Sequence, residues 1–479
     1  MLRQASSYFL IRALNGVLAL ASLVLLTRLM DPAQYGMFSL CLTAINVAAS
    51  VLFQWLNVSI ARFYPRQDVA PGQLLGLAHR MFAEFSALAL LIAGAVALLQ
   101  PMPGLGAPLA LLVGLGAVAM GLHNLHLQIA NARGQPLRYG LISATRAAVG
   151  LLLTLLALRA GWGVAGAVAA LVLACTLAVA LFGARWTAGA TPVPGLRRQL
   201  LRYGAPLALT FAATMLLDVF DRFLIGWLRG PAEVAGYAAA YDLSQQTVGV
   251  VLNVFFLANY PAITAAWERA GAAGARPALA TLARAMLVAA PAVVALFVGL
   301  APTFAQLVFG PGVRDGAQTV MPWIATAIAI GCFKAYVLDV AFQLAGSTHL
   351  QLRITAAMAV LNVVLNLLAV PWLGVLGAAL SATAAFAGGA LLSWWFGRQV
   401  AVYPALGLDL LKALACGALM ALALRSGIGP PAPDGTAWLL VDTAGRCAAG
   451  LLVFGAAALA LNLCGLRRWA ERRAARGRN

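Results

Sequence analysis

Residues 162–182 read WGVAGAVAALVLACTLAVALF, a run of 21 residues without a charged side chain. About 20 consecutive apolar residues are enough for an α-helix to cross the hydrocarbon core of a bilayer. Similar runs follow one another through all 479 residues with short polar breaks between them, and only 10% of the residues are charged. The sequence therefore predicts a membrane protein with many spans.

Fourteen spans are predicted from these runs and from the Gly, Pro or charged residues that separate them. They lie near residues 8–29, 36–56, 81–99, 105–127, 141–158, 162–182, 203–227, 237–258, 279–300, 320–342, 354–370, 375–396, 408–424 and 438–463. The runs are too long and too uniformly apolar for barrel strands, and an isolated span in lipid satisfies its backbone hydrogen bonds only as a helix. The predicted fold class is all-α and polytopic, with 14 transmembrane helices.

Lys and Arg are distributed unevenly between the two sides that these spans define. One set of loops, together with both termini, carries most of them, whereas the other side has only Arg28, Arg159, Arg229, Arg314 and Arg425. Because basic loops stay on the cytoplasmic side, both termini are predicted to be cytoplasmic. The net charge of +18 then reflects topology and contact with anionic lipids. Nucleic acid is not expected as a partner, since the basic residues are scattered over many loops.

An internal repeat relates the two halves of the chain. Three matches, at offsets of 199, 196 and 211 residues, are DPAQYG (31–36) with GPAEVAG (230–236), YP (64–65) with YP (260–261), and GVAGA (163–167) with GVLGA (374–378). These matches predict a six-helix bundle over residues 1–186, a cytoplasmic linker over 187–202 and a second six-helix bundle over 203–400. Helices 13 and 14 (401–465) and a basic tail (466–479) follow. An even number of helices separates the copies, so the bundles are predicted to be related by an axis along the membrane normal.

The residues that leave the first predicted helix carry a family resemblance. Residues 26–39, LTRLMDPAQYGMFS, resemble the first-helix exit of the polysaccharide transporter family, whose usual form is close to A-R-x-L-G-P-x-x-Y-G. The ARG turn at 132–134 and the G-x-x-G-A entries to helices six and twelve resemble that family too. Its members are the Wzx-type flippases of the multidrug/oligosaccharidyl-lipid/polysaccharide exporter (MOP) superfamily. Met30-Asp31 stands where Leu-Gly is commoner, and the second copy of the turn is degenerate.

The resemblance implies a flippase of the bacterial inner membrane. Its cargo would be an undecaprenyl-pyrophosphate-linked oligosaccharide, such as an O-antigen, capsule or exopolysaccharide repeat unit, moved from the cytoplasmic to the periplasmic leaflet by alternating access. Membrane lipids are expected as further partners, with a polysaccharide polymerase and export machinery as candidates. One alternative is a MATE-like drug/cation antiporter with an acid-rich N-terminal cavity. Another is a glycan polymerase or glycosyltransferase with large periplasmic loops. The first two spans contain no carboxylate and the outer loops are short, so we predict a flippase and not an enzyme.

Charges inside the predicted spans fall into paired and unpaired groups. Three pairs lie four residues apart, hence on one helical face: Arg80 with Glu84, Asp218 with Arg222, and Asp442 with Arg446. Three cations, Arg12, Arg146 and Lys334, have no acidic residue three or four positions away. A bare cation within a span normally faces a cavity or a partner, so these three are the predicted substrate-binding residues. The alternatives are snorkelling for Arg12, and interhelical pairing, for instance with Asp339 or Glu84, for Arg146 and Lys334.

Three acidic residues are candidates for ion coupling. Asp218 and Asp221 lie on the outer part of the seventh span, and Asp242 lies near the start of the eighth span on the same side. A carboxylate in a low-dielectric cleft can carry a proton or bind Na⁺. The alternative is that these residues only balance Arg222 and Arg229.

The sequence predicts no catalytic residue, metal site or cofactor. His123 and His126 lie three residues apart, but no third ligand follows at metal spacing. No G-x-x-x-x-G-K-[ST] loop for a nucleotide occurs. Helices 13 and 14 carry many small residues and no unpaired deep charge. They are predicted to bind the lipid tail or to brace the C-terminal bundle, without forming the sugar cavity.

Overall fold

The computed structural model describes residues 2–64, 70–99, 106–184, 194–404, 406–426 and 436–466, which form helices and no strands. The α-helices are α1 (Leu2–Leu29), α2 (Pro32–Ala49), α3 (Trp55–Phe63), α4 (Pro71–Leu99), α5 (Ala107–Ala132), α6 (Pro136–Arg159), α7 (Gly163–Phe182), α8 (Leu196–Leu228), α9 (Pro231–Ser244), α10 (Val250–Val308), α11 (Pro311–Phe333), α12 (Val340–Leu344), α13 (Thr348–Gly397), α14 (Gly407–Arg425) and α15 (Thr436–Ala460). Three π-helical turns connect consecutive helices: η1 (Ser50–Gln54), η2 (Gln245–Gly249) and η3 (Lys334–Leu338). A short 3₁₀ turn, η4 (Leu463–Gly465), follows α15.

Ten helices among the described residues are long and apolar enough to cross a membrane. The protein is therefore an all-α polytopic membrane protein, as predicted. Two of the ten are unusually long: α9, η2 and α10 together form a helical segment of 78 residues (231–308), and His349–Gly397 form one of 49. Each contains non-helical backbone where the sequence predicts a boundary between two spans, at Ala270 and Gly271 in the first and at Gly374 in the second. The total of 14 spans stays a prediction.

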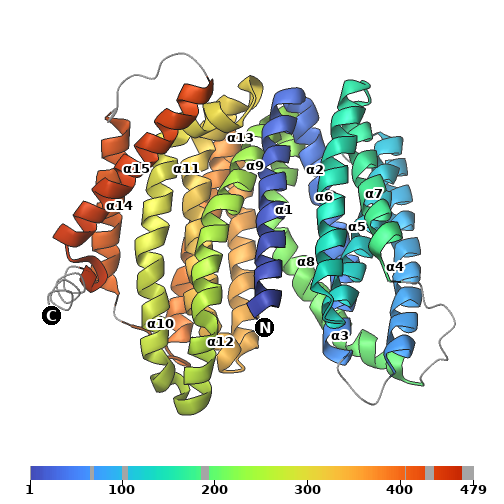
Figure 1. Ribbon diagram of the computed structural model, residues 1–479, viewed down its shortest axis with the longest axis horizontal. Helices are drawn as coiled ribbons and strands as arrows, with labels where there is room; N and C mark the ends of the chain where they lie inside the picture. Colours follow the sequence, from blue (N-terminus) through green and yellow to red (C-terminus); the bar gives the residue numbers. More distant parts are fainter. Residues whose placement is uncertain are drawn as a thin grey trace. The chain divides into compact units, whose positions relative to one another are not determined.

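The chain forms two compact units, Met1–Ala235 and Gly236–Asn479, which are described separately (Figure 1). In the first unit, α8 packs on α2, α3 and η1. The seventh predicted span thus packs with the N-terminal helices, whereas the repeat assigns residues 203–400 to the second bundle. Packing and sequence correspondence are different criteria, so the division based on the repeat stays a prediction. Residues 185–193 of the predicted linker and residues 467–479 of the tail lie outside the described part of the chain.

The core of the first unit lies among α2 to α5. Phe53, Met81 and Leu125 are each at most 1% exposed, and the Phe53 and Phe82 rings lie 4.7 Å apart. A Cβ atom on Gly121 of α5 would collide with the Phe53 ring. The absence of that atom lets α5 approach the π turn η1 closely, as small residues do in membrane helix packing.

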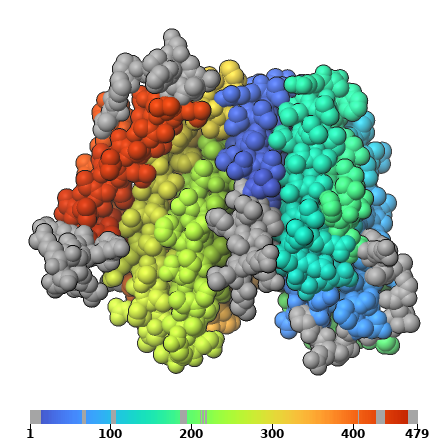
Figure 2. Space-filling view, viewed as in Figure 1, coloured from blue at the N-terminus to red at the C-terminus, as the bar shows by residue number. Residues whose placement is uncertain are grey.

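In the second unit, α14 and α15 pack on α10 (Figure 1). The contact on α14 uses small buried residues, Ala413, Cys416 and Gly417, and a Cβ atom on Gly417 would lie 3.3 Å from the carbonyl oxygen of Pro291. Figure 2 shows the orange-red surface of α14 and α15 beside the yellow surface of α10. This packing supports the prediction that these helices brace the second bundle. Their predicted contact with a lipid tail stays a prediction.

The backbone repeats the correspondence that the sequence shows. The π turns η1 and η2 begin at residues 50 and 245, an offset of 195. Gly163 and Gly374, the first residues of the matching GVxGA segments, have φ values of 53° and 55°. Glycine occupies this left-handed region without steric cost. Shared irregularities at matching positions support an internal repeat more specifically than two sets of regular helices would.

Candidate functional site

Lys334 is a buried cation in the second unit, and Asp339 balances its charge. Lys334 Nζ lies 2.6 Å from Asp339 Oδ2, and the two side chains are 6% and 4% exposed. The residues are five apart, and the π turn η3 between them has the i to i+5 hydrogen-bonding pattern that brings such positions together. Lys334 is therefore not an unpaired cation. Its pairing with Asp339, the alternative considered from the sequence, forms along one helix instead of between helices.

Further polar groups fix this ion pair in place. Ser393 Oγ of α13 donates to Asp339 Oδ1 at 2.7 Å. Beyond α13, the Tyr403 hydroxyl donates to the carbonyl oxygen of Leu338 at 2.7 Å. Burial, together with the Asp339 carboxylate, raises the pKa of Tyr403, so its hydroxyl stays protonated and can donate. A Cβ atom on Gly389 would lie 3.3 Å from Lys334 Cε, which shows how closely α13 surrounds the lysine.

Arg146, on α6 of the first unit, is half-buried. Its Nε atom is buried and has no hydrogen-bond partner among the described residues. The guanidinium interacts electrostatically with His123 of α5 and with Cys175 of α7. Neither group is an acid that would neutralise the cation. A buried donor without an acceptor is uncommon and needs an explanation, and an anionic ligand would supply one.

Contacts to α1 and α7 position α6. Asn15 Nδ2 of α1 donates to Ser143 Oγ at 2.7 Å, and Ser143 lies three residues before Arg146. Arg138, near the start of α6, donates to the carbonyl oxygens of Phe182 at 2.6 Å and Gly183 at 2.5 Å, where α7 ends. Its cation therefore satisfies helix-terminal acceptors. Arg12 lies in α1, but its side chain lies outside the part that the structure describes, so its predicted role stays a prediction.

Three buried histidines lie in α4 and α5, and one of them, His123, interacts with Arg146. His79, His123 and His126 are 1%, 2% and 3% exposed, and the rings of His79 and His126 are 5.7 Å apart. His126 Nδ1 accepts a hydrogen bond of 3.0 Å from the backbone N–H of Ala184, which gives this histidine a structural role after α7. Within the described residues, no group of three or more His, Cys, Asp or Glu is placed to hold a metal ion.

The candidate ion-coupling acids lie in both units. Asp221 of α8 is 4% exposed, and its neighbour Arg222 is 9% exposed. Arg222 Nη1 lies 3.4 Å from Ser39 Oγ and 3.3 Å from Thr43 Oγ1, both on α2. Asp242, in α9, is half-buried. The side chain of Asp218 lies outside the described part, so neither its ion-coupling role nor its pairing with Arg222 is tested.

The structure assembles parts of the predicted site within each unit. It adds His123 beside Arg146, and it adds Asp339 and Ser393 to Lys334. Of the predicted pairs along one helix, Asp442 and Arg446 pair at 2.8 Å. Glu84 also pairs with Arg197 of α8 at 2.8 Å, and its predicted pairing with Arg80 stays a prediction. The sequence offers Asp339 only as an interhelical partner, because spacing rules for α-helices stop at four residues and a π turn has no clear sequence signature.

Comparisons with known proteins agree with this architecture. The profile of a family described as polysaccharide biosynthesis protein matches residues 1–267. Among solved structures, the lipid II flippase MurJ in an inward closed conformation is 12% identical in sequence to this chain, with a TM-score of 0.72. The alignment covers 95% of this chain and 98% of the MurJ chain. An inward-facing multidrug resistance MATE transporter of the MOP superfamily is 17% identical in sequence, with a TM-score of 0.66. That alignment covers 87% of this chain and 96% of the transporter chain. At these identities the two structures show a shared fold. No curated protein gives a significant match.

Proposed function

Since the chain belongs to the polysaccharide biosynthesis protein family, we propose that it is a flippase for an undecaprenyl-pyrophosphate-linked oligosaccharide. The cargo would pass from the cytoplasmic to the periplasmic leaflet by alternating access, as an O-antigen, capsule or exopolysaccharide repeat unit. The bacterial inner membrane is the proposed location, with both termini in the cytoplasm because of the loop charges. The family match is the observation that carries this proposal, and the similarity to the fold of a lipid II flippase supports it.

The buried cations suit the anionic pyrophosphate of such a cargo. Arg146 has a buried donor without a partner, and a guanidinium can bind two phosphate oxygens at once. Lys334 is held by Asp339, so a pyrophosphate would have to compete with that carboxylate. We assign Arg146 as the stronger phosphate contact. Lys334 would bind the phosphate only after its ion pair with Asp339 breaks. Arg12 is the third proposed contact.

Ion coupling is proposed for Asp218, Asp221 and Asp242. Asp221 is buried, and a carboxylate in low-dielectric surroundings can carry a proton or bind Na⁺. Neutralising Asp221 to Asn should then make glycan export insensitive to collapse of the proton or sodium gradient. Unchanged sensitivity of the Asp221→Asn variant to both ionophores would exclude this residue from coupling.

The flippase proposal is tested by removing the two described cations without leaving a buried negative charge. The variant combines Arg146→Gln, Lys334→Met and Asp339→Asn, in cells whose own flippase has been deleted. Loss of surface glycan, with accumulation of the lipid-linked precursor in the inner leaflet and normal protein level, is the expected result.

The control is Arg197→Gln, because Arg197 and Glu84 form an ion pair whose side chains are 58% and 47% exposed, and such pairs contribute little. Normal glycan export by the triple variant would overturn the assignment of the cations. Failure of the native protein to restore export, together with resistance to cationic drugs, would favour an antiporter.

A further inference from the structure

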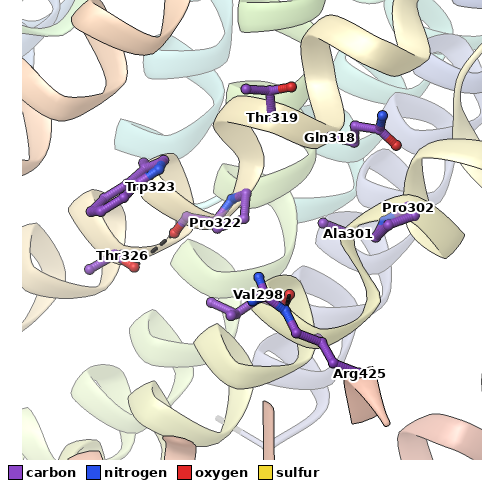
Figure 3. A pocket seen from close by; sticks show the side chains of 10 residues that line it. Val298, Ala301, Pro302, Gln318, Thr319, Pro322, Trp323, Thr326 and Arg425 are labelled. Atoms are coloured by element: carbon purple, nitrogen blue, oxygen red, sulfur yellow. Dashed lines mark hydrogen bonds between the residues drawn. The ribbon is translucent and has the colours of Figure 1, made fainter. Parts of the chain in front are cut away.

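We propose that the second unit binds the head group of an aminophospholipid in the cavity between α10, α11 and the end of α14 (Figure 3). The cavity has a volume of about 550 Å³, within the range of small-molecule sites. None of the residues proposed to contact the glycan cargo or the coupling ion lines it. This site is therefore separate from the transport function proposed above.

Arg425 supplies the cationic end of the cavity. It is the last residue of α14, and its Nε donates to the carbonyl oxygen of Val298 at 3.3 Å. Pro302, four residues after Val298, has no N–H, so this carbonyl lacks its usual helical donor. The hydrogen bond from Arg425 replaces that donor and orients the guanidinium at the cavity, as Figure 3 shows. The Nη groups can then bind a phosphate in the bidentate geometry typical of arginine.

The opposite wall, on α11, presents hydrogen-bond acceptors. Thr326 Oγ1 donates to the carbonyl oxygen of Pro322 at 2.7 Å, and Thr319 Oγ1 donates to that of Asp315 at 2.8 Å. Each hydroxyl hydrogen is thereby used, which leaves the oxygen lone pairs to accept. Pro322 also has no N–H, so the backbone carbonyl of Gln318, four residues earlier, cannot receive the helical hydrogen bond. This wall therefore favours a ligand group that carries several donors.

Phosphoethanolamine combines both requirements, because it joins a phosphate to an ammonium group with three N–H donors. The phosphate would meet Arg425, and the ammonium would donate to the acceptors on α11. The surroundings indicate a lipid: Trp323 in the cavity wall is 43% exposed, and Leu422, three residues before Arg425 on α14, is 64% exposed. Exposed apolar side chains on a membrane helix contact acyl chains. By the loop charges, the site faces the periplasmic leaflet.

The experiment compares lipids that share acyl chains and differ in head group. The purified full-length protein is incubated with phosphatidylethanolamine, phosphatidylcholine or phosphatidylglycerol, and bound lipid is counted by native mass spectrometry. Phosphatidylcholine keeps the positive charge but has no N–H donor, and phosphatidylglycerol has no ammonium. We expect phosphatidylethanolamine to bind roughly tenfold more tightly than either, the effect of one charge-assisted hydrogen bond.

Two variants separate the two ends of the site. Arg425→Ala should weaken phosphatidylethanolamine and phosphatidylglycerol alike, whereas Arg159→Ala, at the exposed end of α6 on the same proposed side, should weaken neither. Thr326→Val, which keeps the side-chain shape, should remove the preference over phosphatidylcholine even if Arg425→Ala fails to fold. Equal binding of the three lipids by the native protein would overturn the proposal. So would displacement of the lipid by an equal concentration of soluble phosphoethanolamine, which would identify a soluble ligand.

Discussion

The residue with the sharpest energetic consequences is Lys334, because its ion pair with Asp339 is shielded from water. Removing one member of a buried pair leaves an uncompensated charge, which costs about 3–5 kcal/mol, whereas removing both members can be nearly neutral. We therefore expect Lys334→Met to lower the melting temperature of the purified protein strongly. The double variant Lys334→Met, Asp339→Asn should recover most of that loss. Equal destabilisation by the single and double variants would contradict the pairing.

A second prediction at this scale concerns Gly121, which faces the ring of Phe53. Because an added Cβ would collide with that ring, and Phe53 is 1% exposed, Gly121→Ala should destabilise the protein by roughly 1–3 kcal/mol, the usual cost of overpacking. The matched control is Gly94→Ala in α4, where nothing lies within 4 Å of the added atom. Thermal unfolding of both variants in the same detergent measures the difference. If Gly94→Ala lowered the stability as much as Gly121→Ala, the packing argument would be refuted.

Among the helices, α14 offers a comparison between its two faces. Ala413 is fully buried against α10, whereas Ala415 and Ala418 are exposed. We expect Ala413→Trp to prevent folding, because the indole cannot fit into the contact with α10. The double variant Ala415→Trp, Ala418→Trp should fold normally but bind lipid-linked substrate more weakly, if the exposed face holds the polyprenyl tail. Fluorescence-detected size-exclusion chromatography measures folding, and substrate retention measures binding. Unchanged binding of lipid-linked substrate by the folded double variant would show that the polyprenyl tail does not bind to this face.

How far the sequence predicts these elements depends on the interaction that forms each of them. Hydrophobic run length predicts membrane helices well, because lipid leaves the backbone few alternatives. The GVxGA segments, which the sequence offers as a repeat match, each begin with a glycine at positive φ, a backbone feature that the match itself does not predict. The π turns cannot be predicted from the sequence, since they differ from an α-helix only by one residue in hydrogen-bond register. Consequently Asp339 is predicted as an interhelical partner of Lys334 and not as a partner along the same helix. The contacts of Arg222 with Ser39 and Thr43, 183 and 179 residues away, depend on tertiary packing that local patterns do not encode.

For the whole molecule, the uneven distribution of Lys and Arg makes a prediction about topology. Both termini should be cytoplasmic. Alkaline phosphatase, which is active only after export, should therefore be inactive when fused after residue 479, whereas a green fluorescent protein fused there should fluoresce. A phosphatase fusion at Gly161, between α6 and α7, should be active as the control. An active C-terminal phosphatase fusion would place the C-terminus in the periplasm and would contradict the prediction.

The π turns η1 and η2 also bear on the history of the chain. A π turn holds one more residue than the α-helical turn it replaces, so it is the geometry that one residue added to an α-helix would produce. The same addition occurs after residue 49 and after residue 244, at matching positions of the two copies. Two independent additions at one position would be a coincidence, whereas a single addition before the duplication accounts for both. If the internal repeat arose by duplication, we expect the half-length ancestor to have carried this turn in its second helix.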